Sequence, residues 1–219
     1  MWETLVDAGF PAEKVIEVPP HIPIADRVTG DLRNNDRDYV LYAGSLFPHK
    51  GVQFLLRASQ LVDKNHQILV VGDGFYRDGL EHLVAELGLA ERVRFLGHVP
   101  PDGMKYEYMR SKIAVVPSAC PETFRLVGPE AMSYACPVVA FESGGVSSWL
   151  QDCRNGFLVK PKDIQGLADK LEILLQNEDL SSETGKWARQ YVATEFTPQR
   201  HLQNLVRVYE EAILQYERA

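Results

Sequence analysis

Six short apolar runs alternate with helix-like stretches along this chain. Each run is bounded by Gly, Pro or charged residues, and together they cover residues 39–43, 67–71, 93–96, 113–116, 137–141 and 156–159. Strands that are apolar throughout indicate a sheet covered on both faces, and the helical intervals supply the crossovers that parallel strands need. Because such crossovers are right-handed, the pattern predicts an α/β fold, a doubly wound Rossmann-like parallel sheet. Its ligand crevice is expected at the carboxyl ends of the strands.

Apolar stripes at helical spacing lie between these runs. One stripe runs through residues 52–62 and another through 80–87, and further helices are predicted at 104–111, 129–135, 164–175, 182–193 and 198–216. The first 38 residues fit the alternation poorly. They predict a short helix at 2–8, a short strand at 15–18, a stiff extended piece at 19–23 and a polar loop at 26–38. Trp149, Trp187 and Tyr209 are interpreted as packing aromatic residues.

The composition is that of one ordinary α/β domain. A chain of 219 residues holds one sizeable core but hardly two, and its apolar share of 45% and charged share of 24% are unremarkable for a globular protein. The net charge of −7 argues against a general nucleic-acid surface, and no apolar run approaches the ~18 residues of a membrane span. Cys120, Cys136 and Cys153 are not spaced as metal ligands, so no metal site is predicted. Any disulfide would leave one of the three unpaired, which favours free thiols in a reducing cytoplasm.

The stretch 120–132, directly after the fourth apolar run, carries the strongest chemical signal. A helix is expected to start there near Leu126, because Pro129 is tolerated only in a first turn. A helix start just beyond a strand offers unpaired N–H groups and a positive dipole end, which suit a phosphate. Glu122 before the helix and Glu130 inside it can accept hydrogen bonds from sugar hydroxyls. These features together predict a sugar-nucleotide site.

Both carboxylates also have a plain structural explanation. The helix dipole alone favours a glutamate in the first turn by ~0.3–1 kcal/mol, which would account for Glu130, and Glu122 can be an ordinary solvated loop residue. The order of the surrounding residues favours the functional explanation. The stretch from Glu122 to Glu130, followed by Ala131-Met132 and by 137–140, resembles the paired-glutamate motif of glycosyltransferase family 4, whose members are retaining enzymes of the GT-B fold.

The resemblance implies a role for each residue of this motif. In that family the first glutamate lies beside the transferred sugar, the second holds the nucleotide ribose, and the backbone between them meets the diphosphate. Carried over to this chain, Glu122 is expected to be catalytic. The donor-binding residues expected here are Phe124, Arg125, Leu126, Val127 and Glu130.

Two cations are predicted at helix starts. Residues 44–51 follow the first strand and open the next helix, so Lys50 lies where the helix dipole disfavours a positive charge. Arg125 lies at the start of another predicted helix, where the dipole disfavours its charge in the same way. A bound anion would reverse the sign in both places. The alternative for Lys50 is an exposed side chain that points away. Two such cations at the carboxyl ends of strands favour a shared diphosphate.

The loop 44–51 also resembles the family's pattern of glycine, arginine, leucine and a later lysine-glycine, whose two cations neutralise the donor diphosphate. Gly44, Ser45 and Lys50 fall on this pattern, but Ser45 replaces the arginine. Arg125 stands where the family usually has a small residue. We therefore expect Arg125 to supply the charge that Ser45 lacks. The alternative is that Arg125 blocks the pocket and marks a degenerate site.

Residues after two further strands are also expected near the donor. Gly72 and Gly74 permit a close backbone approach, and an ordinary strand-to-helix turn explains them equally well. A dinucleotide fingerprint is not indicated, since its third glycine and its acidic residue are missing. By resemblance, this turn faces the donor and His98-Val99 meets the base, although His98 is also explained as a loop surface residue. Ser148 stands where the family has a glutamate that contacts the donor sugar.

The resemblance divides the chain into three parts. Residues 1–38 resemble the end of an N-terminal domain and the interdomain linker, 39–197 the nucleotide-sugar-binding Rossmann-like domain, and 198–219 the C-terminal closing helix. The chain thus resembles the C-terminal, donor-binding half of a GT-B enzyme. An N-terminal domain of similar size, outside this chain, would supply the acceptor site and any peripheral membrane association.

These expectations define part of a hexosyltransferase-type enzyme that transfers a sugar from a nucleoside diphosphate with retention. Glu122 and Lys50 are its expected catalytic residues, and Lys50, Arg125 and the helix amides would oppose charge on the leaving diphosphate. No cofactor or metal is expected, since the donor is a substrate. The isolated chain is expected to be inactive. The alternative left open is a non-catalytic nucleotide-sugar-binding module that acts with a partner chain.

Overall fold

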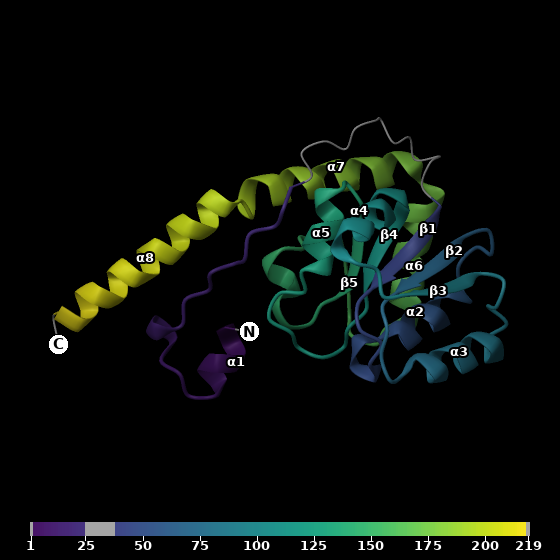
Figure 1. The fold of residues 1–219 in the computed structure, drawn as a ribbon, viewed down its shortest axis with the longest axis horizontal. Helices are drawn as coiled ribbons and strands as arrows, with labels where there is room; N and C mark the ends of the chain where they lie inside the picture. The colour runs from purple at the N-terminus through teal and green to yellow at the C-terminus, as the bar shows by residue number, and fades with distance from the viewer. Residues whose placement is uncertain (1, 25–37, 218–219) are drawn as a thin grey trace.

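A computed structural model describes residues 2–24 and 38–217, and its centre is one parallel sheet (Figure 1). The strands lie in the order β3-β2-β1-β4-β5-β6, and every neighbouring pair is parallel. They are β1 (Tyr39–Ala43), β2 (Gln67–Val71), β3 (Val93–Gly97), β4 (Ser111–Val116), β5 (Val138–Phe141) and β6 (Gly156–Val159). The chain winds outward in one direction through β1 to β3 and in the other through β4 to β6. The switch between β1 and β4 is where a ligand crevice forms in such folds.

Helices cover both faces of the sheet. On one face pack α2 (Val52–Ser59), α3 (Arg77–Glu86) and α6 (Ile164–Gln176), and on the other α4 (Pro101–Arg110), α5 (Val127–Ser133) and α7 (Glu178–Glu195). Each face has its own buried core. In β1, Val40 and Tyr42 belong to one core while Tyr39 and Leu41 belong to the other, as the two-residue repeat of a strand requires. The predicted doubly wound sheet is therefore confirmed.

The predicted elements differ from the observed ones mainly at their ends. β3 includes one further residue, β4 begins two residues earlier, β5 begins one residue later, and the helix predicted at 129–135 runs from Val127 to Ser133. The short helix predicted at 2–8 is present as α1 (Trp2–Asp7). The loop predicted at 26–38 lies, except for Asp38, outside the described residues.

Two sequence-based predictions are wrong. Residues 15–18 are extended but belong to no strand, since they line a cavity and run into Pro19 and Pro20, which have no N–H to donate to a ladder. Of the three aromatic residues interpreted as packing residues, only Trp149 is buried. Trp187 is 49% exposed and Tyr209 is 62% exposed, because they lie on the solvent-facing sides of α7 and α8 (Pro198–Glu217).

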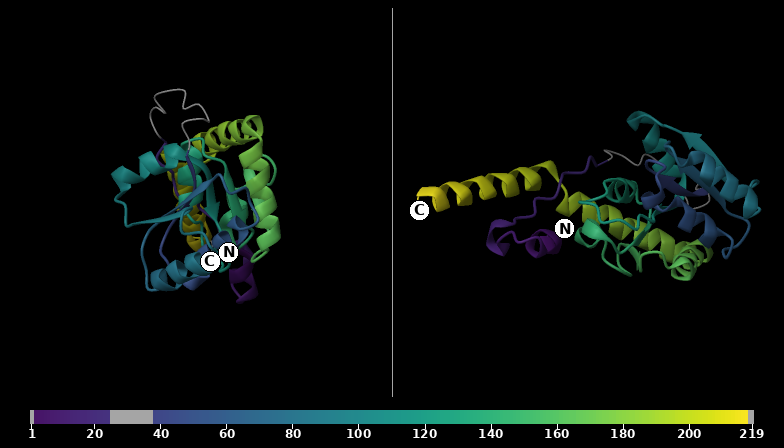
Figure 2. Two further views of the ribbon diagram at one scale, coloured as in Figure 1. Left: turned by 90° about the vertical axis from the view of Figure 1, so that its right-hand side faces the viewer. Right: turned by 90° about the horizontal axis from the view of Figure 1, so that it is seen from below.

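The extended segment that follows α1 packs against the corner where α7 ends and α8 begins. Ile22 is buried, and its N–H donates to the Phe196 carbonyl at 2.8 Å, just after α7 ends. One ring nitrogen of His201, in the first turns of α8, lies 2.7 Å from the Pro19 carbonyl oxygen. Beyond this junction α8 extends away from the sheet (Figures 1 and 2). The extended N-terminal segment is thereby tied to the α7–α8 corner.

Glycines let the ends of neighbouring strands approach closely. Gly72 ends β2 with φ of 127°, and a Cβ atom at this position would lie 1.8 Å from the Gly44 carbonyl oxygen at the end of β1. The Gly44 N–H donates to Val71, and the Gly72 N–H donates to Gly97. Only glycine fits this crossing. The ends of β1, β2 and β3 are therefore held side by side.

Candidate active site

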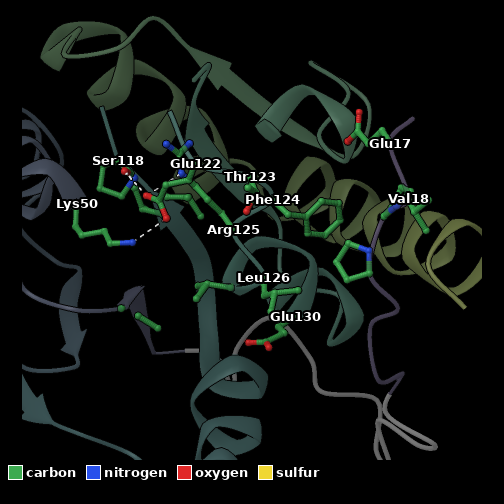
Figure 3. Close-up of a pocket in the computed structure, with 18 of the residues that line it drawn as sticks. Glu17, Val18, Lys50, Ser118, Glu122, Thr123, Phe124, Arg125, Leu126 and Glu130 are labelled. Atoms are coloured by element: carbon green, nitrogen blue, oxygen red, sulfur yellow. Dashed lines mark hydrogen bonds and ion pairs between the residues drawn. The ribbon is translucent and has the colours of Figure 1, made fainter. Parts of the chain in front are cut away.

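A cavity of about 660 Å³ opens at the switch point, where β1 and β4 end. Its wall has three parts, visible in Figure 3. The ends of β1 and β4 contribute residues 42–44 and 115–118, and the loop and helix start after β4 contribute 122–127 and Glu130. The extended segment 15–20 closes one side. The predicted crevice at the carboxyl ends of the strands is therefore present.

A second cavity of about 370 Å³ lies against the first, at the ends of β1, β2 and β3. Ala43, Gly44, Val127 and Glu130 line both cavities. Lys50 and Glu122 line the larger cavity and not the smaller one. Glu130 thus stands at the junction, with room for one extended ligand to pass it on both sides.

Glu122 is the centre of a hydrogen-bond and ion-pair network (Figure 3). Lys50 Nζ donates to Glu122 Oε2 at 2.8 Å, and Ser118 Oγ donates to Oε1 at 2.7 Å. Arg125 Nε lies 3.3 Å from Oε1. Burial by itself would raise the pKa of Glu122. The hydrogen bonds from Lys50 and Ser118, with the charges of Lys50 and Arg125, outweigh burial and hold this pKa below its usual value.

The guanidinium of Arg125 is turned into the protein. Its side chain is 4% exposed, and besides Glu122 it bonds the Ser143 carbonyl at 2.8 Å and the Cys120 carbonyl. Glu122, three residues earlier in the sequence, is therefore the acidic partner of Arg125. The geometry also does not support a guanidinium that blocks the cavity. It supports an arginine that holds Glu122 and joins two loops.

Trp149 and two glycines support the loop that carries Glu122. The indole N–H of Trp149 donates to the Phe124 carbonyl at 2.5 Å, and a Cβ atom at Gly128 would lie 2.2 Å from the indole ring. A Cβ atom at Gly145 would lie 1.8 Å from the Thr123 carbonyl oxygen, and the Gly145 N–H donates to the backbone carbonyl of Glu122 at 2.8 Å. The loop after β5 thus packs directly on the backbone of the motif, which fixes its shape.

Tyr108 holds the side chain of Glu130 through a hydrogen bond. The Tyr108 hydroxyl, on α4, donates to Glu130 Oε2 at 2.8 Å. Four and three residues before Glu130, the backbone N–H groups of Leu126 and Val127 have no hydrogen-bond partner among the described residues. They lie on the cavity wall at the start of α5. An anion in the cavity could accept hydrogen bonds from these groups.

The structure brings most of the predicted site residues together. Around the larger cavity lie Gly44, Lys50, Glu122, Phe124, Arg125, Leu126, Val127 and Glu130. Around the smaller cavity lie Gly44, Ser45, Gly72, His98, Val99, Val127 and Glu130. Gly74 lines neither of these two cavities. A Cβ atom there would lie 2.5 Å from the Leu46 carbonyl oxygen, so its role in the structure is the strand-to-helix turn.

Some residues of the site had not been predicted. Ser118 supports Glu122, and its position directly after β4 is a signal that points to this edge. Tyr42 donates to the Ser45 carbonyl at 3.0 Å, and burial, with a smaller contribution from the charge of Glu122, raises its pKa. Glu17 and Val18 line the cavity from the N-terminal segment, and no pattern in the sequence marks them.

None of the helices in residues 2–24 and 38–217 is long and apolar enough to cross a membrane. Within the same residues, no group of three or more His, Cys, Asp or Glu side chains is placed to hold a metal ion.

The sequence of residues 29–191 matches the family model described as Glycosyl transferases group 1. This match covers more than half of the chain, and the chain belongs to that family. The match includes the paired glutamates, Lys50 and all six strands of the sheet. The predicted family membership is confirmed.

The curated relatives are longer proteins of the same kind. The chain is 34% identical over 180 residues to a D-inositol 3-phosphate glycosyltransferase of Corynebacterium jeikeium, covering 78% of this chain and 42% of the relative. It is 35% identical over 136 residues to an uncharacterised glycosyltransferase of Methanocaldococcus jannaschii, covering 61% of this chain and 35% of the relative. The chain therefore spans between a third and a half of the length of these relatives.

Solved glycosyltransferases share the fold. The Anabaena protein HepE, in complex with UDP and glucose, superposes with a TM-score of 0.80 at 22% identity, over 96% of this chain and 60% of that one. A glycosyltransferase from Rickettsia africae superposes with a TM-score of 0.84 at 19% identity, over 97% and 62%. At these identities the likeness establishes the fold, which is that of the GT-B glycosyltransferases.

Proposed function

We propose that this chain forms the donor-binding half of a retaining glycosyltransferase and binds a nucleoside diphosphate sugar across the two cavities. The observation that carries the proposal is the position of Glu130 at the junction, with the Lys50–Glu122 pair in the larger cavity only. A donor in this orientation has its base in the smaller cavity, its ribose at Glu130, and its diphosphate and sugar in the larger cavity.

The chemistry of transfer in this arrangement is stabilisation of the leaving diphosphate. The Lys50 ammonium has three N–H donors, of which Glu122 accepts one, so the others can reach phosphate oxygens. The unpartnered N–H groups of Leu126 and Val127 add two more donors on the same wall. Fixed donors aimed at developing charge lower a barrier without having to reorganise. Glu122, held in place by its neighbours, orients the hydroxyls of the sugar for front-face attack.

In this proposal Arg125 acts on the diphosphate only indirectly. Its guanidinium is committed to Glu122 and to two backbone carbonyls, so the charge that Ser45 lacks is not replaced by a free cation. The donor is then held by one lysine and by backbone amides. We expect its binding to depend less on salt than a site with two free cations would.

Similar proteins support a uridine nucleotide as the first donor to test. HepE was solved with UDP, with UDP and glucose, and with UDP-glucose, and TarM of S. aureus was solved with UDP. The acceptor site belongs in our proposal to a second domain, since the curated relatives extend well beyond the matched region.

The test is nucleotide binding by a Glu130→Gln variant. Glutamine keeps an oxygen that can accept from Tyr108, whereas alanine would leave a buried phenol unpartnered, so glutamine isolates the effect on the ligand. Calorimetry with UDP, GDP and ADP should show binding of at least one to the native chain. That nucleotide should bind the variant about tenfold more weakly, as for the loss of a charge-assisted hydrogen bond.

A matched control is Glu142→Gln, an exposed glutamate at the end of β5 that lines neither cavity. Its affinity and melting temperature should equal those of the native chain. Native affinity in Glu130→Gln, or no binding of any of the three nucleotides by the native chain, would refute the proposal.

A further inference from the structure

Tyr108 is a buried residue next to Glu130, and the two residues line the smaller cavity together. Tyr108 is 3% exposed, and its ring stacks on Tyr134 with centroids 5.7 Å apart and an interplanar angle of 22°. Its backbone carbonyl accepts a hydrogen bond from Ser111 Oγ at 2.8 Å. Stacking on Tyr134 therefore holds the ring of Tyr108, and the hydrogen bond from Ser111 holds its backbone in α4. The phenol is a rigid donor.

The contact with Glu130 uses one carboxylate oxygen and leaves the other free. Tyr108 donates to Oε2, and Oε1 has no hydrogen-bond partner among the described residues. Because Glu130 lines both cavities, its side chain is exposed to whatever occupies them. Burial, followed by the charge and hydrogen bond of Glu130, raises the pKa of Tyr108, so the phenol stays a donor at every ordinary pH.

We propose that Tyr108 is a positioning residue for nucleotide selection, which locks Glu130 in the orientation that reads the ribose hydroxyls. The inference rests on the proposed function, in which Glu130 holds the ribose. A glutamate side chain that is free to rotate loses rotamer entropy when it binds, and a second hydrogen bond removes that cost in advance. Tyr108 therefore contributes only to ligands that have hydroxyls for Glu130 to bind.

The test is discrimination between nucleotides with and without these hydroxyls. Tyr108→Phe removes one oxygen and keeps the stacked ring. For the nucleotide that the native chain binds best among UDP, GDP and ADP, affinity should fall about tenfold in this variant, as for a hydrogen bond to a charged group. Affinity for the 2′,3′-dideoxy form of the same nucleotide should stay at its native value. A loss of packing alone would weaken both nucleotides equally, and that result would overturn the inference.

Two further variants make the test specific. Tyr106→Phe removes a hydroxyl from the same helix, but Tyr106 is 58% exposed and lines neither cavity, so discrimination should not change. In a Glu130→Ala background, where Tyr108 has no side chain left to position, Tyr108→Phe should have no additional effect on affinity, because the two residues act as one unit. An additive loss in the double variant would overturn the inference.

The outcome also separates this inference from the proposed function. If Glu130→Gln discriminates as well as the native chain, Glu130 does not hold the ribose and the proposed function fails. If Glu130→Gln loses discrimination while a folded Tyr108→Phe retains it, only the inference on Tyr108 fails. Should Tyr108→Phe not fold, Glu130→Asp withdraws the carboxylate from Tyr108 by one methylene. Full discrimination in that variant would overturn the inference as well.

Discussion

Arg125 adopts a backbone conformation that costs free energy. Its φ of 59° lies in the left-handed region, which is unfavourable by about 1–2 kcal/mol for a residue with a Cβ atom. Its side chain offsets this cost by hydrogen bonds to the carbonyls of Cys120 and Ser143 and by the contact with Glu122. Arg125 therefore introduces backbone strain into the loop after β4, and its side chain also stabilises that loop.

Arg125→Gly should relieve the strain and still destabilise the fold. Glycine adopts this φ freely, but the variant loses two hydrogen bonds from a charged donor, each worth about 1.5–3 kcal/mol, so we expect a net loss of roughly 2 kcal/mol. Urea unfolding measures it. Arg207→Ala, at an arginine of α8 that is 64% exposed, serves as the control and should change stability by less than about 0.5 kcal/mol. Equal or greater stability of Arg125→Gly would show that the guanidinium fastens nothing.

Glu122 makes the stability of the fold depend on pH. Its pKa is lower in the folded chain than the usual value of about 4.3, so its ionised form stabilises the fold above that pH. This contribution is lost as the pH falls through the lowered folded value. Glu122→Gln should therefore be less stable than the native chain at neutral pH, and the difference should shrink below about pH 4. Urea midpoints across this range, with Glu142→Gln as control, measure it, and a difference independent of pH would contradict the prediction.

At the scale of elements, the glycine crossing between β1 and β2 positions the smaller cavity. Gly72 cannot carry a Cβ atom without moving the Gly44 carbonyl, and both residues line that cavity. Substitution there should alter the fold and the site together. Gly88 offers a matched comparison, because its φ is also positive, at 68°, while nothing lies within 4 Å of a Cβ atom added to it.

Gly72→Ala should therefore lose about 3 kcal/mol or more, the sum of overpacking and backbone strain, and should lose nucleotide binding with it. Gly88→Ala should lose only the conformational part, about 1–2 kcal/mol, and should bind as the native chain does. Thermal unfolding and calorimetry on both variants provide the measurement. Similar losses in the two variants would mean that the close approach to Gly44 has no energetic weight.

The elements could be predicted from the sequence because each strand is a short apolar run, and strands buried on both faces show no other pattern. Lys50, Glu122 and Glu130 could be placed near one another for the same reason, since the carboxyl ends of parallel strands share one edge. The partners of Arg125 could not be predicted. The Ser143 carbonyl, which accepts a hydrogen bond from Arg125, lies in the loop after β5. The approach of that loop to Arg125 depends on packing around Gly145 and Trp149. The pairing of Tyr108 with Glu130, 22 residues apart on two helices, depends on packing in the same way.

At the scale of the whole molecule, α8 stands apart from the rest of the fold (Figure 2). Six of its large apolar residues are exposed by 45–86%, whereas Leu205 and Val208 are only partly exposed. The six are Leu202, Val206, Tyr209, Ile213, Leu214 and Tyr216. Five of them, all except Leu214, follow one another at alternating spacings of four and three, which places them along one face of the helix. An apolar seam of this kind is rarely left exposed in solution.

We expect the 219-residue chain to self-associate weakly through this seam. A chain with Leu202→Gln, Val206→Gln and Ile213→Gln keeps helix-forming residues but loses the apolar seam, so it should sediment as a monomer where the native chain does not. Leu61→Gln, at a leucine that is 55% exposed elsewhere on the molecule, should sediment as the native chain does. Because none of these side chains is buried, the melting temperatures of dilute samples should agree closely. A native chain that stays monomeric at every concentration would show that the seam does not drive association.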